Sequence, residues 1–104
     1  MPISERPWSN YSEADYADAQ SFCDACLVNL NEGPRAEWTK AACRLPVYEP
    51  GGALNRNGVH AAAARLRQVD APPEARRRAA RKLLAAYREL DEEAPDSVRR
   101  VAGG

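Results

Sequence analysis

The sequence predicts a small α+β domain that is mostly α-helical. Three observations carry this prediction: an apolar stripe at helical spacing over residues 70–90, a second such stripe over residues 55–68, and two strand-like segments between turn clusters in the first half. A chain of 104 residues has the size of one domain. We therefore expect an extended N-terminal arm over residues 1–11, followed by a single α-rich domain over residues 12–104.

The arm is the least patterned part of the chain. Residues 1–11 contain two prolines and show no apolar period of two or of 3.6 residues. Two large aromatic side chains, Trp8 and Tyr11, stand in this polar stretch, and such side chains are costly to leave in water. We expect an arm that is mobile in the free protein, and we expect a partner to cover Trp8 and Tyr11.

A helix and a small β-hairpin are expected after the arm. Residues 13–24 carry apolar side chains at helical spacing behind the capping residue Ser12, and they predict the helix. Residues 26–30 can prolong that helix or form a short strand, and we favour the strand. Residues 43–47 alternate between apolar and other side chains and predict its partner. Because Pro46 cannot donate a backbone hydrogen bond, this second strand must lie at an edge or in a two-stranded pair.

The second half predicts a pair of long helices. Asn55 or Asn57 can cap a helix that continues to about Gln68. The next helix covers about residues 70–90. A capping candidate, two prolines and an acidic residue in the first turn indicate its start. A last short helical turn is expected at residues 96–101. Only a few residues connect the two long helices, so they should pack as an antiparallel pair.

Three cysteines and one histidine raise the question of a zinc site. Cys23 and Cys26 form a CxxC pair, and Cys43 and His60 follow at longer intervals. Structural zinc sites generally present their ligands as two closely spaced pairs, and neither Cys43 nor His60 has such a neighbour. We therefore expect free, buried cysteines of the kind found in a reducing compartment, and neither a metal ion nor another cofactor.

No arrangement of residues typical of an active site can be assembled from the sequence. The chain has one histidine, no sharp turn around a serine and no glycine-rich phosphate-binding loop. A helix pair of this size also leaves little room for a deep pocket. We expect a protein that is not an enzyme and takes no small-molecule substrate. Since no run of 18 apolar residues occurs, we also expect a soluble, intracellular product without membrane contact.

A net charge of zero hides a polarised distribution. Residues 1–55 carry 4 basic and 8 acidic side chains, whereas residues 56–104 carry 11 basic and 7 acidic ones. Arg77, Arg81 and Arg88 share one face of the second long helix. The chain has no net positive charge, and no aromatic stacking platform accompanies this face. These features disfavour nucleic acid as its partner and favour acidic protein groups.

Several segments of the chain together resemble a known family. They are residues 43–47 (CRLPV), 52–66 (GALNRNGVHAAAARL), 71–74 (APPE), 82–88 (KLLAAYR) and 95–97 (PDS). In these segments the chain resembles a small helical domain of tailed bacteriophages, especially those of actinobacteria. That domain occurs alone or attached to prohead proteases and other head-gene products. The likeness covers about residues 38–101, includes a similar WSNY segment at residues 8–11, and brings no catalytic residue to this chain.

The resemblance implies a structural role in a virion. The expected function is that of a minor capsid or decoration protein that binds the major capsid protein lattice and stabilises the shell. Its expected location is the capsid, and the host cytoplasm during assembly. A weak contact becomes strong in aggregate when a symmetric lattice repeats it. Two alternatives stay open: a nucleic-acid-associated or zinc-stabilised regulatory module, and a transient head-assembly factor. The expected contact residues are Trp8, Tyr11, Arg77, Arg81 and Arg88.

Overall fold

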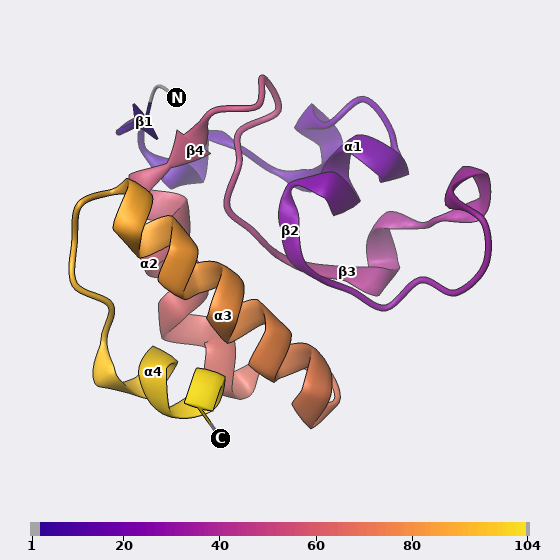
Figure 1. Ribbon diagram of the computed structural model, residues 1–104. Helices are drawn as coiled ribbons and strands as arrows, with labels where there is room; N and C mark the ends of the chain where they lie inside the picture. The colour runs from indigo at the N-terminus through magenta and orange to yellow at the C-terminus, as the bar shows by residue number, and fades with distance from the viewer. Residues whose placement is uncertain (1–2, 104) are drawn as a thin grey trace.

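The computed structural model describes residues 3–103 and confirms a mostly helical α+β fold (Figure 1). Along the chain, the helices and strands are β1 (Ile3–Ser4), α1 (Ala19–Asp24), β2 (Cys26–Asn29), β3 (Cys43–Pro46), β4 (Leu54–Asn55), α2 (Arg56–Arg65), α3 (Pro73–Glu89) and α4 (Asp96–Gly103). Single 3-10 turns lie at Trp8–Asn10, Glu13–Asp15, Arg35–Glu37, Lys40–Ala42 and Leu66–Gln68.

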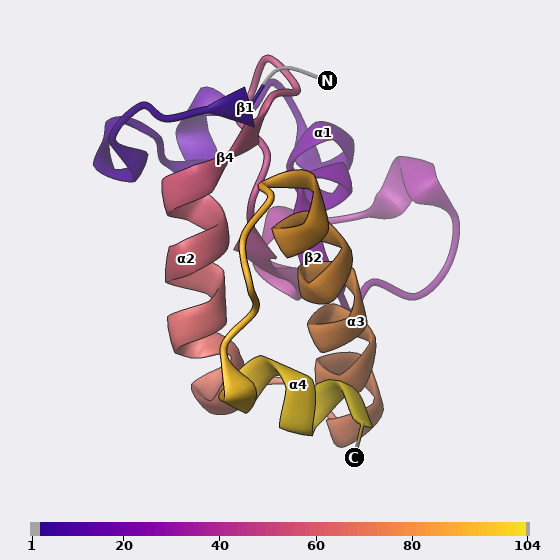
Figure 2. The ribbon, with the colours of Figure 1, turned by 60° about the vertical axis from the view of Figure 1, so that its left-hand side comes forward.

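The helices α2 and α3 form the predicted antiparallel pair, and α4 packs across the end where α2 finishes and α3 begins (Figure 2). Alanines such as Ala62, Ala79 and Ala80 line the buried faces and let the helices approach closely. Pro73 occupies the first turn of α3, where its missing N–H has no intrahelical role. The centre of the core consists of large, fully buried side chains: Leu54, Leu66, Leu83, Val59 and Val98.

The predicted β-hairpin is present. Strands β2 and β3 pair antiparallel, with Cys26 opposite Pro46 and Val28 opposite Arg44. The sheet has two strands, so Pro46 lies in the kind of pairing that its missing N–H requires. The favoured strand for residues 26–30 is therefore confirmed, and α3 packs against it.

The single helix expected over residues 13–24 is wrong. Two short helical segments replace it, the 3-10 turn Glu13–Asp15 and the helix α1. Each has its own capping box, one between Ser12 and Asp15 and the other between Asp18 and Ser21. Short polar side chains that bond to nearby backbone groups favour helix starts over helix interiors. Two such starts in succession divide the segment into two.

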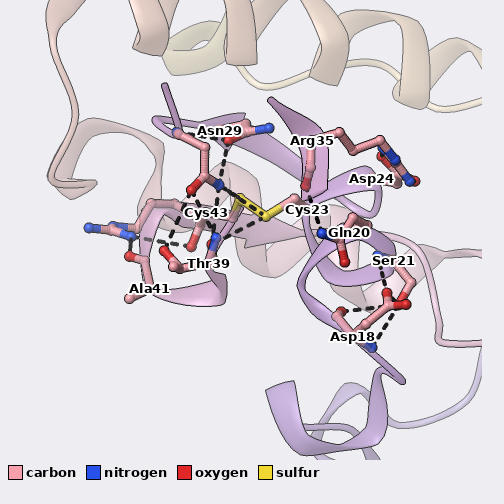
Figure 3. The surroundings of a disulfide bond; sticks show 12 residues. Asp18, Gln20, Ser21, Cys23, Asp24, Asn29, Arg35, Thr39, Ala41 and Cys43 are labelled. Atoms are coloured by element: carbon pink, nitrogen blue, oxygen red, sulfur yellow. Dashed lines mark hydrogen bonds and ion pairs between the residues drawn. A yellow bond between two sulfur atoms is a disulfide. The ribbon is translucent and has the colours of Figure 1, made fainter. Parts of the chain in front are cut away.

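The expectation of free cysteines is corrected as well. Cys23 of α1 and Cys43 of β3 form a disulfide (Figure 3). Cys26 is a buried free thiol. An odd number of cysteines excludes complete pairing but not one bond. The packing of α1 against β3 brings the two Cα atoms to 5.5 Å, within the range of disulfides. Sequence spacing gave no indication of this packing.

The disulfide joins the parts of a second, smaller core. This core contains the buried side chains of Tyr16, Phe22, Cys23, Cys26 and Cys43. It has far fewer large aliphatic side chains than the core of the helices. The disulfide links this core covalently, and such a cross-link stabilises mainly by restricting the unfolded chain.

We predict that replacing Cys23 and Cys43 together by alanine lowers the free energy of unfolding by about 3 kcal/mol, since the bond closes a loop of 20 residues. Urea denaturation with and without reductant measures the effect. Reductant should destabilise the wild type and leave the double variant unchanged. Equal sensitivity of both proteins to reductant would contradict the assignment.

Candidate functional site

The N-terminal segment is attached to the domain from its first described residue. Strand β1 pairs parallel with β4, with Ile3 opposite Leu54 and Ser4 opposite Asn55. The segment expected to be an extended arm over residues 1–11 is thus paired with the domain in its described part, residues 3–11. Pairing of this kind uses backbone groups alone, so it leaves no side-chain period in the sequence.

The side chain of Asn55 fixes this attachment. It is completely buried, and its Oδ1 accepts a hydrogen bond of 2.8 Å from the backbone N–H of Gly58, which caps α2. Its Nδ2 donates to the carbonyl oxygen of Arg6 at 3.1 Å and to Oε2 of Glu49 at 2.8 Å. Asn57 also donates to the carbonyl of Arg6, at 3.0 Å. The chain is thereby held beside the first turn of α2.

Trp8 then lies on α2 because residue 58 is glycine. A Cβ atom at Gly58 would come within 3.1 Å of several Trp8 ring atoms. Glycine inside a helix costs about 1 kcal/mol relative to alanine, and here it permits an aromatic ring to contact the helix backbone. The ring of Tyr11 lies 5.7 Å from that of Trp8, in a tilted arrangement.

An apolar groove of about 230 Å³ lies beside these two rings. Trp8 and Tyr11 are only half-buried in it, so part of each ring is open to a partner. The sequence-predicted aromatic contact residues are thus brought together in one concave surface. The groove is lined by Trp8, Tyr11, Ser12, Glu13, Tyr16, Phe22, Cys43, Arg44, Leu45 and Pro46.

The β3 side of the groove contains a strained residue. Leu45 has a φ angle of 61°, in the left-handed region that leucine rarely adopts, although the side chain is buried. This conformation costs about 1–2 kcal/mol. Such a conformation persists only where the surrounding structure holds it, and here the buried side chain of Leu45 is part of the core.

The carboxylate of Glu49 lies beneath the attached N-terminal segment and is buried. Burial by itself would raise the pKa of Glu49. Hydrogen bonds from Ser4, Asn55 and Tyr11, with the charge of Arg6, outweigh burial and hold the pKa below its ordinary value. The ionised carboxylate therefore stabilises the attachment.

The predicted basic residues do not form one surface. Arg77 and Arg81 lie one turn apart on α3 and line a small hollow of about 130 Å³ together with Glu74 and Arg78. Arg88 is exposed in the last turn of α3, at the opposite end of that helix. None of Arg77, Arg81 and Arg88 lines the aromatic groove described above.

The candidate zinc ligands are separated in the fold. Nε2 of His60 lies 2.7 Å from Oε1 of Glu92, and its ring stacks on Tyr87 with centroids 5.9 Å apart. Cys23 and Cys43 are bonded to each other. Among residues 3–103, no three His, Cys, Asp or Glu side chains are arranged to hold a metal ion.

The His60 and Glu92 pair is an exposed electrostatic contact between α2 and the segment after α3. Glu92 also accepts a hydrogen bond from Arg56. The hydrogen bond with His60, followed by the bond from Arg56, lowers the pKa of Glu92. The carboxylate of Glu92 fixes the orientation of the His60 imidazole through this hydrogen bond. The contact links α2 to the segment between α3 and α4.

Sequence reasoning missed the structural importance of Glu49, Gly58 and Leu45. Asn55 was proposed only as a helix cap. Of these, Gly58 carried a signal, because a glycine in the first turn of a predicted helix indicates close approach of another group. The left-handed backbone of Leu45 has no signature in its residue type.

Comparison of the chain with protein-family models, with curated proteins and with solved structures gave no match. Across the described residues, no helix combines the length and apolar character needed to cross a membrane.

We predict that Glu49→Gln lowers the free energy of unfolding by about 1–2 kcal/mol at pH 7, because the amide cannot replace the charged acceptor. The folded-state pKa of Glu49 is lowered, so the stabilisation is present above the unfolded-state pKa of about 4.3 and is lost as pH falls through the folded-state pKa. The difference between the two proteins should therefore shrink in acid. Denaturant titrations from pH 7 to pH 3 measure it.

Glu32→Gln, at an exposed position in the turn after β2, serves as the matched control and should change stability by less than about 0.5 kcal/mol at pH 7. A Glu49→Gln effect that stays constant from pH 7 to pH 3 would contradict the role given to the carboxylate.

Proposed function

We propose that the chain is a structural protein of a bacteriophage virion, a minor capsid or decoration protein that binds the major capsid protein lattice and stabilises the shell. The resemblance described above supports this proposal, since its segments fall on elements that form one unit. Residues 43–47 include β3, residues 52–66 include β4 and α2, and residues 82–88 belong to α3. Buried side chains from all of these segments contribute to one core.

The disulfide between Cys23 and Cys43 is the observation that favours a protein retained in the particle. Disulfides persist in oxidising surroundings, among them virion surfaces, whereas cytosolic thiols are kept reduced. A capsid protein leaves the cell with the particle. A regulatory module or a transient assembly factor completes its work in the reducing cytoplasm. The bond therefore supports the virion function over both alternatives.

The remaining geometry fits a docking protein better than a zinc-stabilised or nucleic-acid-binding module. Two of the three cysteines are joined to each other, and His60 is engaged with Glu92. Arg77 and Arg88 lie at opposite ends of α3 and do not form a continuous track for a phosphate backbone. We assign the capsid contacts to the aromatic groove with Trp8 and Tyr11 and to the basic surfaces of α3.

Mass spectrometry of purified virions tests the proposal. We predict that the chain is present in stoichiometric proportion to the major capsid protein. Alkylation without reduction should leave Cys23 and Cys43 unmodified in those particles, because they are joined. A chain found in infected cells and absent from particles would contradict the virion function and favour the regulatory module or the transient assembly factor.

A further inference from the structure

A hollow of about 400 Å³ lies where α2 ends and α3 begins. Three elements build it: the 3-10 turn after α2, the start of α3, and α4. Both guanidinium groups and apolar side chains line this hollow. It is lined by Arg67, Pro73, Arg76, Arg77 and Val101, and we call it the arginine hollow.

Arg67 and Arg76 of this hollow lie next to each other. Nη1 of Arg76 lies 3.5 Å from the carbonyl oxygen of Arg67, so the two residues are held next to each other. No carboxylate of residues 3–103 forms an ion pair with Arg67 or Arg76, whereas Arg56 and Arg99 each have acidic partners. Within residues 3–103, no ion pair neutralises the positive charge of Arg67 and Arg76.

The lining indicates what chemistry this ligand has. Guanidinium groups form paired hydrogen bonds with carboxylates and phosphates. Pro73 and Val101 add an apolar wall that suits a side chain next to the anionic group. The anionic ligand should therefore also carry apolar groups, which a protein segment supplies.

The surroundings of the hollow disfavour a nucleic acid. Glu74 lines the adjoining hollow on α3, and Asp70 lines another one beside Arg65. Both acids lie within a few residues of the arginine hollow in the chain, so a long phosphate backbone that ran along this surface would meet like charges. A short acidic segment can end within the arginine hollow and so avoid these like charges.

We propose that the arginine hollow binds a short acidic protein segment, whose carboxylates contact Arg67 and Arg76 and whose apolar side chain contacts Pro73 and Val101. The proposal rests on the proposed function for the origin of the segment, a capsid protein. Its chemistry can be tested on the free protein. Arg67 and Arg76 were not among the contact residues expected from the sequence.

Fluorescence anisotropy with a labelled peptide of alternating glutamate and leucine, (Glu-Leu)3, tests the site on the full chain. We expect saturable binding that the double variant Arg67→Gln/Arg76→Gln weakens by about tenfold or more. The lysine pair Arg67→Lys/Arg76→Lys should recover part of the loss, since it restores charge without the planar fork. Unchanged thermal unfolding midpoints establish that the variants are folded.

The double variant Arg65→Gln/Arg100→Gln is the matched control, because it removes the same charge from exposed positions that lie outside the hollow and outside the expected contact residues. An equal loss of affinity in this control would overturn the site. No binding of (Glu-Leu)3, equal binding of the neutral peptide (Gln-Leu)3, or tighter binding of a 20-base-pair DNA duplex would each overturn it too. Because all of these measurements use isolated protein, their outcome is independent of whether virions contain the chain.

Discussion

The fully buried amide of Asn55 connects three parts of the chain that are distant in sequence. Its oxygen caps α2 through Gly58, and its nitrogen donates to the carbonyl of Arg6 and to the carboxylate of Glu49. Away from water, each of these groups would cost about 1–3 kcal/mol without a partner. No buried side-chain nitrogen or oxygen among the described residues lacks a hydrogen bond. One side chain thus satisfies a backbone donor, a backbone acceptor and a buried charge at once.

The aromatic groove depends on this arrangement. With the carbonyl of Arg6 fixed, the following turn places Trp8 on Gly58, and Tyr11 packs beside it. On the other side, the disulfide holds Cys43 at the start of β3, which carries the strained Leu45. The groove therefore lies between two fixed supports, a polar network and a covalent bond. A surface held in this way loses little conformational entropy when it binds a partner.

The helices could be predicted from the sequence because each has a local signature. Each of these signatures lies within a short stretch of sequence: the apolar stripe of α3, the prolines at its start, and the cap of α2. The strand at residues 43–47 was predicted from its alternating apolar and other side chains. Pro46, which lacks a backbone N–H, restricted it to an edge or to a two-stranded pair. Contacts between distant segments left no comparable signature. The pairing of β1 with β4 uses backbone groups only, and the bond between Cys23 and Cys43 depends on how α1 packs on β3.

The candidate site was predictable in part for the same reason. Trp8 and Tyr11 stood out as large aromatic residues in a polar segment, and they do line the groove. Arg67 and Arg76 come from different elements and meet only through the turn between α2 and α3, so their proximity required the fold. Arg77, Arg81 and Arg88 share a helical face by spacing, but the length of α3 separates the first from the last.

The central claim is that the N-terminal segment is a structural part of the domain. The free energy of unfolding of a chain lacking residues 1–11 tests this claim most directly. The deletion removes the contact of Trp8 with Gly58 and the partners of Asn55 and Glu49, so stability should fall by about 3 kcal/mol or more. An unchanged free energy of unfolding would show that the segment is a separate arm and would contradict the account.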